Sequence, residues 1–184
     1  MDEAEKRRII RDAATIVLLR ERNGSHQVLM GQRGAGAVFM PNKYVFPGGA
    51  LDKQDFDIVP ARPLSQLDAQ KLTYQAPEGI ASALAMAAVR ELWEETGLML
   101  AQEGETAHEV PADWQGFYNK GLAPRADVLQ FIFRAITPPG RPRRFDARFF
   151  IANSAAVFGD DEDFSEASDE LGHLHWIDLE EAKA

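Results

Sequence analysis

The chain has 184 residues, 45% of them hydrophobic, and a formal net charge of −9. This is enough apolar sequence for one buried core and predicts a single domain, residues 1–184. The acidic balance argues against binding nucleic-acid backbones or anionic membranes. The lack of cysteine excludes disulfides and cysteine-based zinc sites. With no signal peptide and no apolar run of about 18 residues, we expect a soluble cytoplasmic protein.

The N-terminal part predicts a β-hairpin. Residues Ala14–Glu21 and Gln27–Arg33 are rich in strand formers, and an Asn-Gly pair typical of a tight turn stands between them. A loop with two prolines follows, and it carries an aromatic and β-branched piece. We expect the Gly-Gly pair, Gly48 and Gly49, to end that piece.

One long helix dominates the middle of the chain. Residues 52–76 look irregular, although Ser65 could open a short helix through a capping box. Pro77 suits the first turn of a helix that runs to about Thr96. Gly97 is then its left-handed C-terminal cap.

The C-terminal third predicts a second hairpin and a last strand. Residues 127–137 and 145–153 are strand-like and flank a turn-forming proline, glycine and arginine segment. An acidic loop, residues 159–170, precedes a strand at Leu171–Asp178. The residues after this strand, 179–184, are enough for only the first turn of a helix.

The long helix carries a cluster of acidic side chains near its end. At roughly 100° per residue, Glu91, Glu94 and Glu95 fall on one side, opposite an apolar side. Arg90 can pair with Glu94, whereas Glu91 and Glu95 are like charges one turn apart. A solvated helix face is one interpretation. A bound divalent metal such as Mg²⁺, which prefers oxygen ligands, is the other.

The segment RELWEETGL, Arg90 to Leu98, decides between these interpretations. With the glycine of FPGG at Gly49, it resembles the signature of the Nudix hydrolases, Gly-x5-Glu-x7-Arg-Glu-U-x-Glu-Glu-x-Gly-U, in which U is apolar. Gly49 lies much further from Arg90 than the signature allows, so an insertion, about residues 52–76, interrupts it. The first signature glutamate falls on Ser82.

Two acids near the insertion could replace that glutamate. Asp52 and Asp55 follow FPGG directly, and the sequence does not choose between them. The segments FMPNKYVFPGGALDKQDFD and TPPGRPRRFDARFFIA further resemble the Nudix subgroup that includes the peroxisomal coenzyme A diphosphatases. The resemblance implies an α/β fold, the Nudix α/β/α sandwich with a mixed sheet.

The resemblance also implies a metal-dependent reaction. Glu91, Glu94 and Glu95, with the main-chain carbonyl of Gly48, are expected to hold Mg²⁺ or Mn²⁺ and to promote attack of water on a diphosphate. Arg90 is expected to orient these carboxylates. The catalytic residues implied are therefore Arg90, Glu91 and Glu94, together with a general base.

The sequence gives weaker signals for the general base and for the substrate-binding residues. Glu170, or Glu166, in the acidic loop could be the base, although acidic loop residues are more often simply solvated. Arg33 or the cluster that ends at Arg144 could meet a remote phosphate. Phe39 could line a pantetheine arm or pack beneath its loop.

The implied partner is a small nucleoside diphosphate derivative, with coenzyme A or an acyl-CoA favoured. ADP-ribose, another nucleotide sugar or a dinucleotide is the alternative substrate. A non-catalytic Nudix-like nucleotide sensor is the alternative function. No nucleic acid or membrane is expected as a partner, and a homodimer is a possible assembly. His173 and His175 lack a third ligand nearby and are interpreted as structural.

Overall fold

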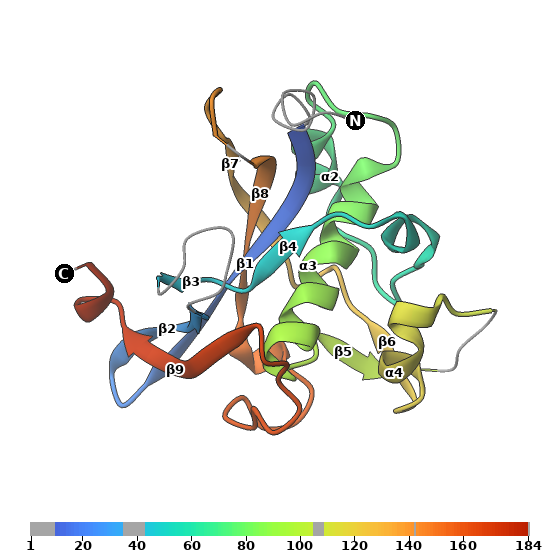
Figure 1. The fold of residues 1–184 in the computed structure, drawn as a ribbon. Coiled ribbons are helices and arrows are strands. Elements are labelled where there is room, and N and C mark those ends of the chain that lie inside the picture. The colour runs from blue at the N-terminus through green and yellow to red at the C-terminus, as the bar shows by residue number, and fades with distance from the viewer. Residues whose placement is uncertain (1–9, 35–42, 105–108, 142, 184) are drawn as a thin grey trace.

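The structure, a computed structural model, describes residues 10–34, 43–104, 109–141 and 143–183 (Figure 1). Its main sheet has seven strands: β1 (Ile10–Arg22), β2 (Ser25–Arg33), β3 (Tyr44–Val45), β4 (Gly48–Ala50), β7 (Gln130–Ile136), β8 (Arg144–Asn153) and β9 (Leu171–Asp178). A second, two-stranded sheet pairs β5 (Ala101–Glu103) with β6 (Leu122–Pro124).

Three α-helices and four 3-10 helices complete the described part of the chain. They are α2 (Gln66–Leu72), α3 (Ile80–Thr96), α4 (Gln115–Tyr118), η1 (Lys53–Asp57), η2 (Ala112–Trp114), η3 (Ser154–Ala156) and η4 (Glu181–Lys183). No helix in the described residues is long and apolar enough to cross a membrane.

The main sheet is mixed, as predicted. Its strand order is β3-β2-β1-β8-β7, with β4 paired to β1 and β9 paired to β2. Strand β1 runs parallel to β8 and antiparallel to β2 and β4. The long strand β1 therefore lies at the centre of the sheet. Its residues 13–15 pair with β4, which lies beside α3 (Figure 1).

Both predicted hairpins are confirmed. Strands β1 and β2 pair antiparallel around Asn23 and Gly24, whose φ angles of 54° and 78° suit a tight hairpin turn. Strands β7 and β8 also pair antiparallel, and the predicted last strand is β9. The chain after β9 forms the short turn η4.

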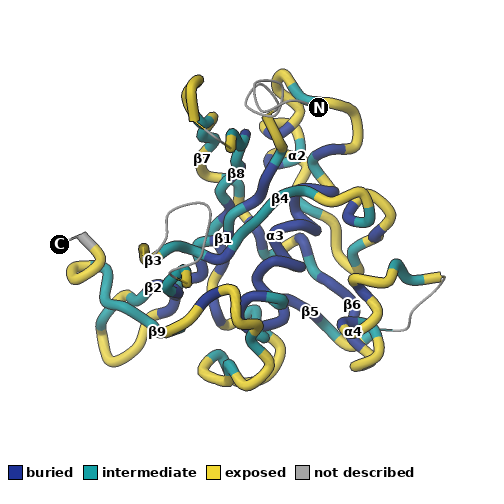
Figure 2. Tube along the Cα trace, in the orientation of Figure 1, coloured by how far each residue is buried: buried dark blue, intermediate teal, exposed yellow. Residues whose placement is uncertain are grey.

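Helix α3 is buried on nearly every side. Its residues from Ala83 to Leu92 are all buried, including Arg90 and Glu91 (Figure 2). The helix contacts β1, β4 and η1, and its Trp93 ring meets the edge of Phe117 in α4. The solvated-face interpretation is therefore wrong, because segments distant in the sequence cover the charged side.

Two local predictions need correction. Helix α3 begins at Ile80 rather than Pro77, because Gly79 has a left-handed φ of 76° that a right-handed helix cannot contain. The Gly-Gly pair lies inside strand β4 rather than ending a strand. A Cβ at Gly48 would lie 2.5 Å from the carbonyl oxygen of Ala14, so the glycine permits this close pairing.

The insertion is folded rather than irregular. Its first part is η1. Ser65 caps α2, as predicted, by accepting a hydrogen bond from the amide of Asp68 (3.1 Å), but in place of the reciprocal bond of a capping box its hydroxyl donates to the Asp68 carboxylate (2.8 Å). The main chain of Ala61 donates to Pro124 (2.8 Å), and Ile58 and Leu72 are buried in the core. The insertion therefore packs against β6 and brings η1 to α3.

Candidate active site

Strand β4 lies directly on the carboxylates of α3. Glu91 and Glu95 are 8% and 2% exposed. The amide of Gly48 donates to Oε2 of Glu95 (2.8 Å), and a Cβ at Gly49 would lie 2.3 Å from Oε1 of Glu91. A side chain at position 49 would therefore force the Glu91 carboxylate to move, which agrees with the glycine of FPGG.

Arg90 bonds to the acidic groups around it. Its Nε and Nη2 donate to the two oxygens of Asp55 (2.9 and 3.1 Å), and Nη1 donates to Glu91 (3.0 Å) and Glu94 (2.8 Å). A further bond from Nη2 reaches the carbonyl of Ala50 in β4 (3.1 Å). The planar fork of arginine suits this two-point binding of a carboxylate. Arg90 thus contacts two of the carboxylates that it is predicted to orient.

Asp55 supplies the acidic partner that the broken signature lacks. Its side chain is fully buried and accepts hydrogen bonds from Arg90, from the amide of Asp52 (2.9 Å) and from Nε1 of Trp114 (3.4 Å). Asp52 itself is 51% exposed and 3.8 Å from Arg90, while Ser82 is exposed. The structure therefore chooses Asp55 over Asp52. Sequence reasoning missed the role of Trp114, since nothing local connects it to η1.

The carboxylates of α3 have raised pKa values. Burial raises the pKa of Glu91 to about 7, although Arg90 opposes the shift. Burial, followed by the charge of Glu91, raises the pKa of Glu95 to about 8. Burial also raises the pKa of Glu94. The site therefore resists carrying a negative charge on Glu91 and Glu95 at the same time, and Arg90 and the Gly48 amide offset only part of this cost.

This donor set fits a hard divalent cation in its chemistry. Carboxylate oxygens are the ligands that Mg²⁺ and Mn²⁺ prefer, and a cation would relieve the repulsion between Glu91 and Glu95. Within the described ranges, no three His, Asp or Glu side chains are already arranged to hold a metal ion. Arg90 holds one oxygen of Glu91 and one of Glu94, and the amide of Gly48 holds one of Glu95.

Arg33 and Glu170 approach the same carboxylates from the sheet edge. Arg33, the last residue of β2, pairs across the sheet with Leu171, the residue after Glu170. The positive charge of Arg33 lowers the pKa of Glu95, and the negative charge of Glu170 raises it. Glu170 is exposed at the end of the acidic loop. The structure therefore brings together two residues that are far apart in sequence.

Other predicted residues lie elsewhere. Arg144 donates to the carbonyl of Thr137 (3.0 Å) and pairs with Ile10, five residues along β1 from the partner of Gly48. That separation is about 16 Å along a strand, so Arg144 does not meet the carboxylates and its role stays a prediction. Phe39, with its neighbours Val38 and Met40, lies outside the described residues.

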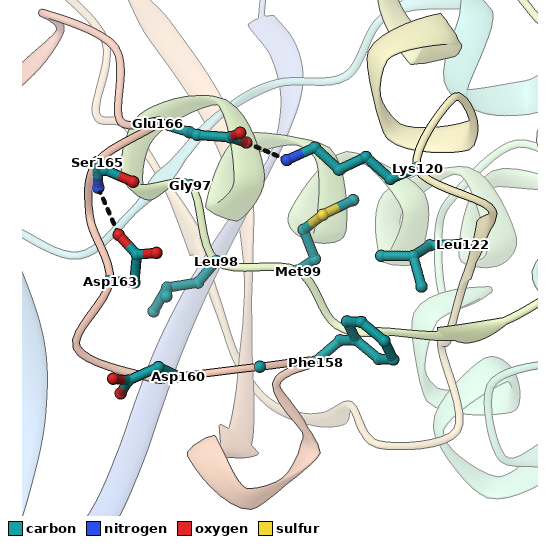
Figure 3. A pocket seen from close by; sticks show the side chains of 11 residues that line it. Gly97, Leu98, Met99, Lys120, Leu122, Phe158, Asp160, Asp163, Ser165 and Glu166 are labelled. Carbon is teal, nitrogen blue, oxygen red and sulfur yellow. Dashed lines mark hydrogen bonds and ion pairs between the residues drawn. The ribbon is translucent and has the colours of Figure 1, made fainter.

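The remaining candidates have structural contacts. Glu166 forms an ion pair with Lys120 beside the end of α3 (Figure 3). Nδ1 of His175 contacts the carbonyl of His173 (2.8 Å), and its ring meets the edge of Tyr44. These contacts agree with the structural interpretation of the two histidines.

The chain is similar to Nudix proteins in sequence and structure, although no family model matches it. A protein of Caenorhabditis elegans that carries the name nudix hydrolase 7 is 29% identical over 93% of this chain and 52% of its own length. The chain thus spans about half the length of this relative. The crystal structure of a NUDIX hydrolase from Alicyclobacillus acidocaldarius matches with a TM-score of 0.68 and 28% identity, over 95% of this chain and 81% of that one.

A more distant match concerns the fold alone. The NUDIX domain of Shewanella oneidensis NrtR, solved with ADP ribose, has a TM-score of 0.52 and 12% identity, over 100% of this chain and 87% of that one. Together with the closer match, it confirms the predicted α/β fold with a mixed sheet.

The pair of Asp55 and Arg90 predicts a large effect for a small change. Asp55→Asn should lower the free energy of unfolding by about 2 to 4 kcal/mol, because it leaves a buried guanidinium short of one counter-charge. Asp52→Asn, the matched control in the same segment, should cost less than about 0.5 kcal/mol because Asp52 is exposed. Urea unfolding without metal measures both. Equal effects would contradict the role of Asp55.

The raised pKa of Glu95 predicts a gain in stability on its replacement. The folded state holds the Glu95 proton more tightly than the unfolded state, whose pKa is about 4.3. Stability is therefore full below that pH and is lost as the pH rises through about 8. In chelator, Glu95→Gln should melt several degrees above the wild type at pH 8, with a smaller difference at pH 5. The exposed control, Glu78→Gln, should show neither effect.

Proposed function

We propose that this chain, which has the Nudix fold, is a divalent-metal-dependent Nudix diphosphatase. Its reaction would hydrolyse the diphosphate bond of a nucleoside diphosphate linked to another moiety, with coenzyme A or an acyl-CoA as the preferred substrate. The observation that carries the proposal is the contact of Glu91 and Glu95 in the RELWEETGL helix with the glycines of FPGG. The similarity to Nudix hydrolases over almost the whole chain supports it.

The metal would be held by α3 and β4. The proposed ligands are Glu91, Glu94, Glu95 and the carbonyl of Gly48, with Mg²⁺ or Mn²⁺ as the ion. When bound, such an ion neutralises charge on the diphosphate and lowers the pKa of a bound water. Arg90 keeps Glu91 and Glu94 in place through its hydrogen bonds, and Asp55 fixes Arg90 in turn.

The residues at the sheet edge would complete the reaction. Arg33 supplies a positive charge beside Glu95 and suits an oxygen of the diphosphate. Glu170 is the proposed general base. It would accept the proton of the attacking water as the new P–O bond forms and the bond between the phosphates breaks.

The preference for coenzyme A rests on the subgroup resemblance of the FPGG segment and of residues 137–152. Arg33 is a candidate for one phosphate, and Arg144, remote from the carboxylates, is a candidate for the 3′-phosphate. Phe39 stays a candidate for the pantetheine arm. ADP-ribose and dinucleotides remain competing substrates. The complete set of helix acids disfavours a nucleotide sensor without catalysis.

A metal requirement is the first functional prediction. Mg²⁺ or Mn²⁺ should raise both the hydrolysis rate and the melting temperature, because binding to the folded state adds to its stability. Ca²⁺ should bind and stabilise while supporting little turnover. Rate measurements and thermal melts in chelator and in each metal check this. Hydrolysis that is unchanged in chelator would contradict the mechanism.

The substrate preference needs a comparison on one enzyme preparation. Coenzyme A, ADP-ribose, NADH and a dinucleoside polyphosphate are assayed side by side in Mg²⁺, with products separated by chromatography. Coenzyme A should give the highest kcat/KM and yield phosphopantetheine and adenosine 3′,5′-bisphosphate. If another substrate wins by tenfold, about 1.4 kcal/mol of transition-state preference, the coenzyme A assignment fails and the diphosphatase assignment stands.

A further inference from the structure

The acidic loop, residues 159–170, crosses the C-terminal end of α3 before the chain enters β9 (Figure 1). The amide of Ser168 donates to the carbonyl of Glu94 (3.0 Å), so the loop is attached to the helix that carries the carboxylates. A Cβ at Gly97 would lie 3.3 Å from Glu166, which shows how closely the loop passes. Glu170 follows two residues after Ser168, and its position depends on that of the loop.

The middle of this loop does not rest fully on the hydrophobic core. A hollow of about 270 Å³ lies beneath it, between the loop acids and an apolar floor (Figure 3). The floor includes Leu98, Met99, Leu122 and Phe158. Only Phe164 of the loop packs against the core as a hydrophobic side chain among those described. The position of the loop therefore depends largely on polar anchors.

The strongest anchor is Arg20 at the end of β1. Its Nη1 and Nη2 donate to the carboxylates of Asp161 and Glu162, both at 3.1 Å, and its Nε donates to Gln27 (2.8 Å). The guanidinium lies 4.3 Å from the ring centroid of Trp176, whose Nε1 donates to the carbonyl of Asp161 (3.0 Å). Two strands of the sheet thus hold the start of the loop.

Burial makes this anchor stronger than its neighbours. Arg20 is only 9% exposed, whereas its partners Asp161 and Glu162 are 27% and 45% exposed, so burial shields the guanidinium side of these bonds and the stacking on Trp176 adds to them. Arg22 also pairs with Glu162 but is 48% exposed, and the pair of Lys120 and Glu166 is 38% and 55% exposed. Exposed ion pairs of this kind contribute little to the stability of the fold.

We propose that Arg20 is a positioning residue for the reaction. By holding Asp161 and Glu162, it fixes the acidic loop so that Glu170 faces Glu91 and Glu95. This inference rests on the proposed function and on Glu170 as the base. A base acts only within hydrogen-bond reach of its water, so a loop displaced by about 1 Å loses much of the rate.

The first test replaces the anchor conservatively. Arg20→Lys keeps the charge but loses the two-point bond and the stacking. We expect kcat to fall at least tenfold on the best substrate in Mg²⁺, with KM changed less than twofold. The matched control, Arg22→Lys, should keep kcat within twofold. The double variant Asp161→Asn with Glu162→Gln changes only the loop and leaves Arg20 in place. Its kcat should fall by a similar factor.

A double-mutant cycle with Glu170→Gln separates positioning from general damage to the fold. If Arg20 acts through Glu170, the combined variant should be no slower than Glu170→Gln alone. Independent losses that multiply would overturn the inference. An unchanged kcat in Glu170→Gln would also overturn the inference. In that case, metal-dependent hydrolysis by the wild type would still support the proposed function. A wild-type enzyme without hydrolysis would instead contradict the proposed function itself.

Discussion

The buried guanidinium of Arg90 is the interaction on which the site depends. It lies among Asp55, Glu91 and Glu94 and also donates to the carbonyl of Ala50. Burial alone would lower the pKa of Arg90, but the hydrogen bond and charges of these acids raise it. Removing one partner from such a buried charged group lowers the stability of the folded state strongly. One side chain therefore ties η1, β4 and α3 into a single unit.

The same arrangement leaves two acids without a cationic partner of comparable strength. Glu91 shares Arg90 with two other carboxylates, and Glu95 is held by the amide of Gly48. Their raised pKa values show that folding places negative charge where it is disfavoured. Functional sites commonly retain such a cost because ligand binding relieves it. The strained electrostatics are thus part of what makes this end of α3 a candidate metal site.

Arg20 applies the same physical principle at the edge of the sheet. A buried arginine again binds two acids from a segment with little apolar packing. In both places, a guanidinium bonds to acidic side chains of a segment that is distant from it in the sequence. The protein has an acidic excess, and the structure concentrates part of that excess around two cations that sit on the rigid elements β1 and α3.

The sequence by itself determined the features that local chemistry controls. The Asn-Gly turn, the strand character of β7 and β8, the Ser65 cap and the left-handed Gly97 all follow from neighbouring residues. The RELWEETGL segment likewise identified the helix that carries the site.

Only the tertiary structure decided which distant residues meet that helix. The choice of Asp55 over Asp52 depends on the burial of Asp55 and on its two bonds to Arg90, which lies 35 residues further along the chain. The approach of Glu170 to Glu95 depends on the pairing of β2 with β9. Burial of most of α3 depends on how the insertion and α4 pack. The periodicity of a sequence indicates which face of a helix is apolar and which is charged. Contacts between remote segments depend instead on packing and strand register.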